Sequence, residues 1–173
     1  MAKKPAQPAV TAADLKDALK RDWSKKYQVF DRYSKQKPTE DAIPWLRKAL
    51  ADSYHGTVKC AAVSLRKLGP QAVAAMDDLL AAAYLVDDFH MPQAYPECLE
   101  AMMAIDPGSD ELIPLIKHFT GLDNWVPTSA SLRALKTIGT PEALDLFERF
   151  AAFWEPELNK MQRRVVEQLR GKR

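Results

Sequence analysis

The chain has 173 residues, of which 47% are hydrophobic and 28% are charged, which is ordinary for a soluble globular protein. The formal net charge of +2 provides no general attraction to nucleic acid or to an anionic membrane. The longest apolar run, residues 79–86, is too short to span a bilayer.

The first residues carry Lys3 and Lys4 but no apolar segment follows them, so no secretory signal is expected. Proline and lysine favour an extended chain here. The sequence therefore predicts a disordered lead over residues 1–10, a single domain over residues 11–173, and a cytoplasmic location.

The first predicted helix runs from Thr11, a candidate N-cap with Asp14 three residues later, to about Lys35. Apolar residues recur along it at spacings of four and three, which predicts one stripe facing the core. The stripe consists of Leu15, Leu19, Trp23, Tyr27 and Phe30.

A second helix is predicted from Thr39 to Leu50, with Pro44 in its first turn, where proline is tolerated. Three helix pairs should follow: 56–68 with 70–85, 92–105 with 109–120, and 127–138 with 141–153. A last amphipathic helix from about residue 156 would cap the array. No segment alternates with period two, so no sheet is expected.

The three pairs are related by a degenerate repeat. Leu65, Met102 and Leu135 occupy equivalent positions, at steps of 37 and 33 residues. The breaks between paired helices fall at equivalent places too, namely Gly69, Asp106 and Gly139. Units of this length cannot bury their apolar face alone, and they are typical of a stacked helical solenoid.

Residues 61–73 and 131–144 resemble the HEAT-repeat family, and Ile43-Pro44 and Ile113-Pro114 match the family's Val-Pro type of second-helix start. The third unit departs, with Asp106-Pro107 at its turn. The resemblance covers about residues 40–153. It implies an all-α, right-handed α-α superhelix of about four HEAT-like helix pairs with a C-terminal capping helix, and a role mostly as a scaffold for protein binding.

Some HEAT-like proteins are enzymes. The family's iron-dependent hydroxylases carry paired His-Glu dipeptides, whereas His55, His90 and His118 are followed here by Gly, Met and Phe. The family's DNA glycosylases depend on a basic groove, and its phycobilin lyases need a deep apolar pocket that the sequence does not identify. We therefore expect no metal and no cofactor.

Other catalytic arrangements are also missing from the sequence. Cys60 and Cys98 lack a neighbouring His, and they are either buried free thiols or a disulfide between adjacent helices. The adjacent carboxylates Asp77 and Asp78 point about 100° apart on a helix, so they do not form a facing pair. The glycines are scattered singly, without a phosphate-binding loop. The sequence thus predicts a protein that is not an enzyme.

In this fold the second helices usually line the concave side, so their solvent-facing residues are the predicted partner-binding site. These residues are Trp45, Arg47, Lys48, Asp77, Asp78, Lys117 and His118. Their charge changes sign from helix to helix, which favours a protein partner over a phosphate backbone. Trp45 is the expected anchor, and Trp125 and Trp154 are secondary candidates.

The resulting hypothesis is a non-catalytic protein-binding module, with an inhibitor of a partner enzyme, such as an immunity protein for a toxin, as its favoured form. An adaptor or an assembly chaperone fits the sequence as well. The alternative is a nucleic-acid-binding or DNA glycosylase-like HEAT protein, and it depends on the basic ends of the chain. These ends carry Lys3, Lys4, Arg163, Arg164, Arg170, Lys172 and Arg173.

Overall fold

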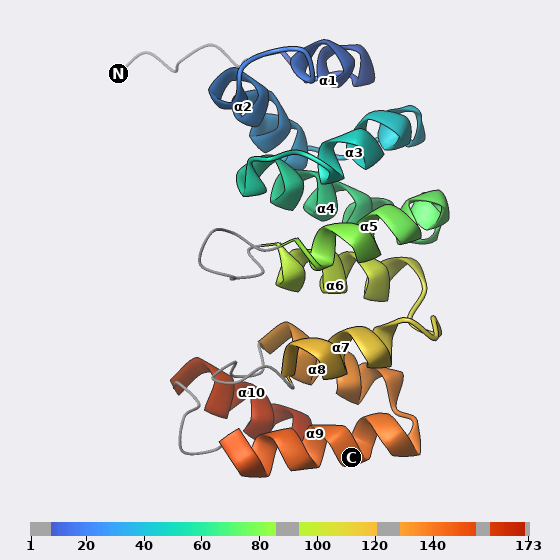
Figure 1. Ribbon diagram of the computed structural model, residues 1–173, viewed down its shortest axis with the longest axis vertical. Coiled ribbons are helices and arrows are strands. Elements are labelled where there is room, and N and C mark those ends of the chain that lie inside the picture. Colours follow the sequence, from blue (N-terminus) through green and yellow to red (C-terminus); the bar gives the residue numbers. More distant parts are fainter. Residues whose placement is uncertain (1–7, 86–93, 121–128, 155–159, 172–173) are drawn as a thin grey trace.

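The computed structural model describes residues 8–85, 94–120, 129–154 and 160–171 (Figure 1). All of the regular structure in these ranges is helical, as the sequence predicts. The α-helices are α1 (Ala12–Ala18), α2 (Trp23–Ser34), α3 (Ile43–Leu50), α4 (His55–Leu68), α5 (Met76–Ala83), α6 (Tyr95–Ile105), α7 (Leu112–Thr120), α8 (Ser129–Ile138), α9 (Pro141–Trp154) and α10 (Lys160–Gly171). Two 3-10 segments, Glu40–Ala42 and Gly69–Ala75, lead directly into α3 and α5.

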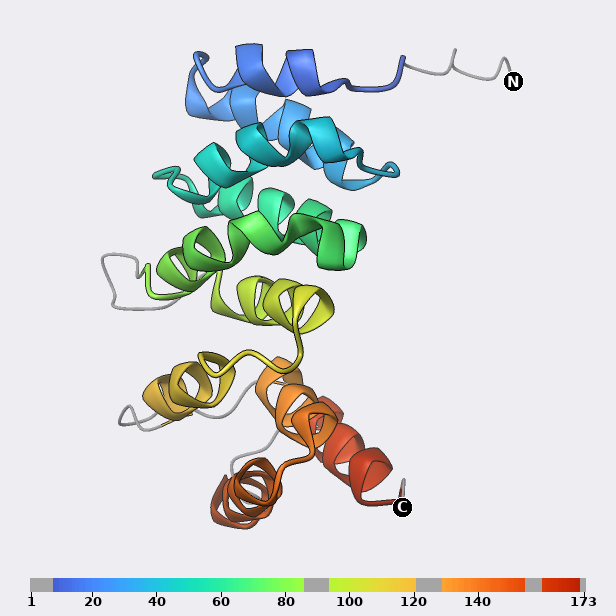
Figure 2. The ribbon, with the colours of Figure 1, turned by 90° about the vertical axis from the view of Figure 1, so that its right-hand side faces the viewer.

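The helices lie in two rows. The front row of Figure 1 contains α3, α5, α7 and α9, and α1 contacts α3 at its upper end. The back row contains α2, α4, α6, α8 and α10, each in contact with the next. Figure 2 shows the same rows from the side. The most extensive contacts join helices that are neighbours in the sequence or successive members of the back row.

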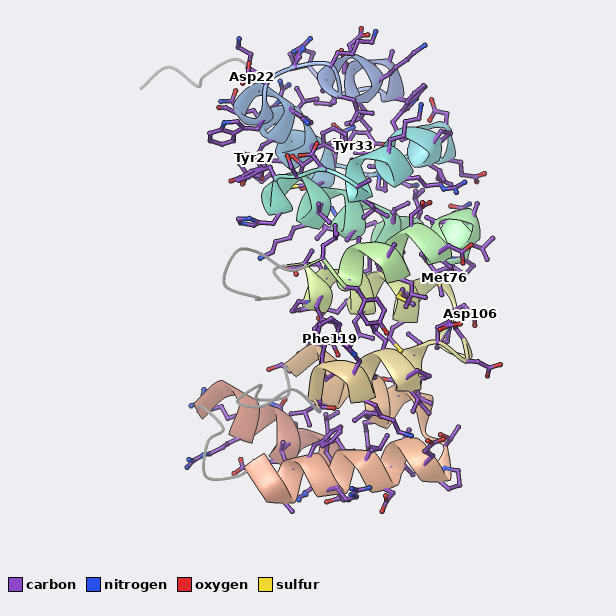
Figure 3. The ribbon with its side chains drawn as sticks, viewed as in Figure 1. Asp22, Tyr27, Tyr33, Met76, Asp106 and Phe119 are labelled. Carbon is purple, nitrogen blue, oxygen red and sulfur yellow. The ribbon has the colours of Figure 1, made fainter. Side chains whose placement is uncertain are left out.

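Successive helices run in opposite directions across the molecule. In Figure 3, Met76 at the start of α5 and Asp106 after the end of α6 lie on the right-hand side, whereas Phe119 near the end of α7 lies further left. Tyr27, in the second turn of α2, lies on the left as well. The carboxyl ends of front-row helices and the amino ends of back-row helices thus share one edge.

The single helix predicted over residues 11–35 is wrong, because the chain breaks between α1 and α2. The Thr11–Asp14 capping box starts α1, and the N–H groups of Lys20 and Arg21 close a turn on Asp17 and Ala18. The side chain of Asp22 then accepts the N–H of Lys25 and starts a new helix. An aspartate that satisfies free backbone donors can begin a helix without any Gly or Pro before it.

This break also changes the predicted apolar stripe. Leu15 and Phe30 are buried, but Leu19 and Tyr27 are only partly buried and Trp23 is 58% exposed. Trp23 follows the break directly, so it no longer continues the face that Leu15 begins. The assignment of Trp23 to the core is wrong.

The turns between paired helices confirm a special backbone at two of the three predicted breaks. Gly69 and Gly139 have φ of +59° and +67°, a region that favours glycine. Asp106 instead has an extended backbone with φ of −148°. Its carboxylate accepts the N–H of Gly108 at 3.0 Å, so a side-chain hydrogen bond shapes this turn without positive φ.

The core runs along the interface between the two rows. Of the five core positions predicted from the repeat, Leu65, Leu68, Ile105 and Leu135 are buried, and Ile138 is half-buried. The N-terminal boundary also differs from the predicted one. Val10, assigned to the lead, is 6% exposed, and its N–H donates to the side chain of Gln36 at 3.1 Å.

Candidate functional site

The seven predicted contact residues all lie on the front row. We call them the front-row surface: Trp45, Arg47 and Lys48 from α3, Asp77 and Asp78 from α5, and Lys117 and His118 from α7. Arg47, Lys48, Asp77, Lys117 and His118 are exposed, whereas Trp45 and Asp78 are partly buried. These helices bury their opposite sides against the back row, so the amphipathic pattern places the seven residues outward.

Trp45 is the aromatic group of this surface. Its ring is packed partly against the core and stays accessible. The Lys48 Nζ lies 5.0 Å from the ring centroid, and the Lys16 Nζ, from α1, lies 5.3 Å from it. Ammonium groups at this distance are attracted by the ring's π electrons. Trp45 therefore lies at the junction of α1 and α3, within reach of two cations.

Part of the charge on the surface is neutralised within the chain. The guanidinium of Arg47 on α3 forms an ion pair with the carboxylate of Asp78 on α5. Lys117 on α7 pairs with Glu142 on α9, with 2.6 Å between Nζ and Oε1. The change of sign between successive helices, which the sequence suggested as a partner-facing pattern, thus joins neighbouring helices of the row.

His118 lies in a group of rings at the edge where α5 and α7 end. Its ring centroid is 4.9 Å from that of Tyr84 and 4.9 Å from that of Phe119. Tyr84 is 41% exposed, and Tyr95 packs on Phe119 at 4.3 Å. Burial raises the pKa of the Tyr95 hydroxyl, which shares a 2.9 Å hydrogen bond with the Ser131 hydroxyl. These rings connect α5 to α7, and Tyr84 extends the front-row surface.

A second group of rings lies outside the predicted site, at the amino ends of α2 and α4. Tyr54 contacts Trp23, Tyr27 and His55, with centroid distances of 5.0, 5.4 and 5.0 Å. The Tyr54 ring also covers Gly56, where an added Cβ would lie 2.5 Å from it. The glycine is thus required for this packing, and the group has a clear structural role.

The outer side of the back row carries its own ion pairs. Glu100 on α6 lies between Arg66 on α4 and Arg133 on α8 and pairs with both. A groove of about 400 Å³ runs beside these three residues. Because each charge already has a partner here, the groove offers less free charge than the front-row surface does.

The sequence pattern does not reveal two residues of the site, Lys16 and Glu142. Lys16 on α1 lies beside Trp45 on α3, and α1 is separated from α2 by the new helix start at the N-cap Asp22. Glu142, the partner of Lys117, lies in the first turn of α9, where carboxylates complement the helix dipole. Neither contact follows from helical periodicity alone.

The candidate chemical groups are dispersed. Cys60 and Cys98 are buried free thiols, and burial raises the pKa of both, for Cys98 to about 12. Thiols in such surroundings are poor nucleophiles. Of the histidines, His55 and His118 lie in the two separate ring groups, and His90 lies outside the described residues.

Within the ranges given above, no three His, Cys, Asp or Glu side chains come together as metal ligands would. The same part of the chain contains no helix with the length and apolar character needed to cross a bilayer.

The basic ends are described only in part. Arg163 and Arg164 are exposed on α10, and Arg170 pairs with Glu148 of α9 at 2.9 Å. Lys3, Lys4, Lys172 and Arg173 lie outside the described residues, as does Trp125. The side chain of Trp154 is likewise not described.

Comparison with known proteins gives no relative from which a role could be transferred: no family model, no curated protein and no solved structure matches the chain. The function must therefore be argued from the front-row surface itself.

Proposed function

We propose that this chain is a non-catalytic protein-binding module, built as a HEAT-like solenoid, and that a partner protein binds its front-row surface. The first version to test is that this chain inhibits a partner enzyme, as an immunity protein inhibits its toxin. The observation that carries the proposal is the accessible ring of Trp45 at the centre of a cationic site on a helical surface.

Trp45 has the properties of an interface anchor. Tryptophan is enriched among the residues that dominate binding energy, because a large rigid ring buries much area at little entropic cost. Its partial packing on the core and the two lysines restrict the ring before any partner arrives. A pre-organised side chain loses less freedom on binding, which favours affinity.

The HEAT-like part of the proposal is supported by agreement between the repeat and the helix rows. Residues at equivalent positions near the starts of the front-row helices, namely Ile43, Met76, Ile113 and Leu144, are all half-buried. The equivalent glycines Gly69 and Gly139 share a positive φ. Repeat proteins of this kind use one row of helices as an extended binding surface.

The expected result of Trp45→Ala is a loss of partner affinity of about 2 kcal/mol or more, roughly thirtyfold. The partner would be sought among the proteins of neighbouring genes, by co-precipitation followed by calorimetric titration. Because Trp45 also touches the core, Trp45→Leu is made beside it, since leucine keeps apolar packing and removes the ring. Helix content and unfolding midpoint of both variants are measured by circular dichroism.

Trp23→Ala is the matched control, since Trp23 is an exposed tryptophan on α2, in the other row. The proposal predicts that this variant binds the partner like the wild type. Loss of affinity in Trp23→Ala with no loss in Trp45→Ala would move the interface to the ring group around Tyr54. Tight duplex-DNA binding with a steep salt dependence, and no protein partner, would refute the protein-binding function.

A further inference from the structure

The cations around Trp45 are not neutralised by the chain. Lys16 and Lys48 are both exposed and reach the same ring from different helices. Their distances to the ring centroid place the two ammonium groups within about 10 Å of each other, which is close to the screening length of physiological salt. An anion near the ring is therefore attracted by both lysines at once.

Three carboxylates that are close to these lysines in the sequence already have partners within the chain. Asp17, next to Lys16, pairs with Lys20 at 3.3 Å. Asp14 accepts the N–H of Thr11 at 2.8 Å, and this hydrogen bonding lowers its pKa. Asp52, one turn after Lys48, pairs with Lys26 and is almost fully buried. Within the described residues, no carboxylate forms an ion pair with Lys16 or Lys48.

Two acidic groups remain at the amino end of α3, Glu40 and Asp41, and both are exposed. Asp41 lies one turn before Trp45, at the amino end of α3, where the helix dipole stabilises a carboxylate. It is exposed and sits toward the other end of the helix from Lys48. The site is therefore cationic beside the ring and bounded by negative charge on one side.

We propose that the lysine–tryptophan site, formed by Lys16, Trp45 and Lys48, receives an acidic side chain of the partner protein, with an adjacent apolar side chain packed on the Trp45 ring. This inference rests on the proposed function and names the partner's chemistry at that surface. A carboxylate fits because its negative charge would neutralise the ammonium groups of Lys16 and Lys48, neither of which has an ion-pair partner within the described residues. The apolar neighbour follows from the partly exposed ring beside the two lysines.

The distribution of charge on this surface favours a protein partner over a nucleic acid. A phosphate backbone is followed by a continuous stripe of cations. Here the unpaired positive charge is confined to Lys16 and Lys48. The guanidinium of Arg47 is paired with Asp78, and the exposed Asp77 lies on the next helix of the row. A partner that offers one or two carboxylates beside an apolar group avoids these acids, whereas a long polyanion would meet them.

The test uses the whole chain labelled with 5-fluorotryptophan, whose four resonances are assigned by single Trp→Phe substitutions. The probes are the blocked peptide Glu-Glu-Leu-Phe-Glu-Glu, the same peptide with Gln in place of Glu, and a duplex DNA. We expect the acidic peptide to shift the Trp45 resonance and to leave that of Trp23 in place. The Gln peptide should shift neither.

Three variants make the test specific. The double substitution Lys16→Gln with Lys48→Gln should weaken binding of the acidic peptide by about tenfold or more. Lys25→Gln with Lys35→Gln, an equal change of charge at lysines already paired with Asp22 and Asp31, should leave it nearly unchanged. Asp41→Asn should strengthen binding, because it removes part of the negative charge that bounds the site.

The outcomes separate this inference from the proposed function. The acidic-partner inference would be overturned if the Glu and Gln peptides shifted the Trp45 resonance equally. It would also be overturned if both double variants lost the same affinity for the acidic peptide. If Trp45→Ala abolishes binding of the natural partner while the Lys16 and Lys48 changes do not affect it, the binding surface stands and the acidic contact is wrong. If the duplex DNA shifted the Trp45 resonance more than the acidic peptide did, the site would be assigned to a polyanion instead.

Discussion

Leu65→Ala should lower the free energy of unfolding by about 2–5 kcal/mol, because it removes a side chain that is 0% exposed and leaves a cavity. Leu65 lies in α4, which packs on α2 and α3 before it and on α6 after it. In a structure held by contacts between neighbours, the loss should also loosen those helices. Chemical denaturation gives the free energy, and amide hydrogen exchange shows where protection falls.

Val73→Ala is the control for this truncation, because Val73 is 61% exposed. It should change stability by no more than about 0.5 kcal/mol. If Leu65→Ala unfolded at the same denaturant concentration as Val73→Ala, the assignment of the repeat's core positions would be wrong.

Asp52→Ala should cost about 3–5 kcal/mol, because it leaves the ammonium of Lys26 without its partner in a buried position. The exposed fractions of the two side chains are only 14% for Lys26 and 6% for Asp52. Asp52 also accepts the N–H of Tyr54 at 2.9 Å, just before α4 begins, so the substitution removes that hydrogen bond as well. Urea denaturation followed by circular dichroism measures the loss.

Two further variants separate the energetic effect of burying the charge from that of breaking an ion pair. Asp17→Ala breaks the exposed pair with Lys20 and should cost no more than about 1 kcal/mol. Replacing Lys26 by Met and Asp52 by Leu together should recover most of the lost stability, because no unpaired charge remains. Equal losses in Asp52→Ala and Asp17→Ala would show that burial of the Lys26–Asp52 pair does not govern its energy.

The helices that the sequence predicted well are those with a clear apolar period and a marked end. The segment before Gly69 is one such case, because its apolar period stops at a residue that adopts positive φ. The segment before Asp106 is another, although its turn is formed by a side chain. In both, local signals and tertiary packing agree, which is the condition under which sequence patterns are reliable.

The break after α1 could not be predicted from periodicity. Residues 19–22 contain neither glycine nor proline, and Trp23 continues the spacing of four that Leu15 and Leu19 begin. Only the hydrogen bond from the Lys25 N–H to Asp22 marks the new start, and an aspartate serves equally well inside an exposed helix face. As a result, the position of Lys16 beside Trp45 was not foreseen.

The sequence predicts on which side of its helix each candidate contact residue lies, but it does not predict the contacts that the residue makes. Helical periodicity places Arg47, Asp78 and Lys117 outward, because it depends only on position along one helix. Which of them pair, as Arg47 does with Asp78, depends on the offset between neighbouring helices. This offset is set by core packing across the two rows, so it is absent from the local pattern.

The central claim is that a partner protein covers the front row, and hydroxyl-radical footprinting of the complex tests it most directly. Oxidation is measured at side chains of both rows in the free and the bound chain. The account predicts protection of Trp45, Met76 and His118 on the front row, with Trp23 and Met103 on the back row oxidised as in the free protein. Protection of Trp23 and Met103 with unchanged oxidation of Trp45 would contradict it.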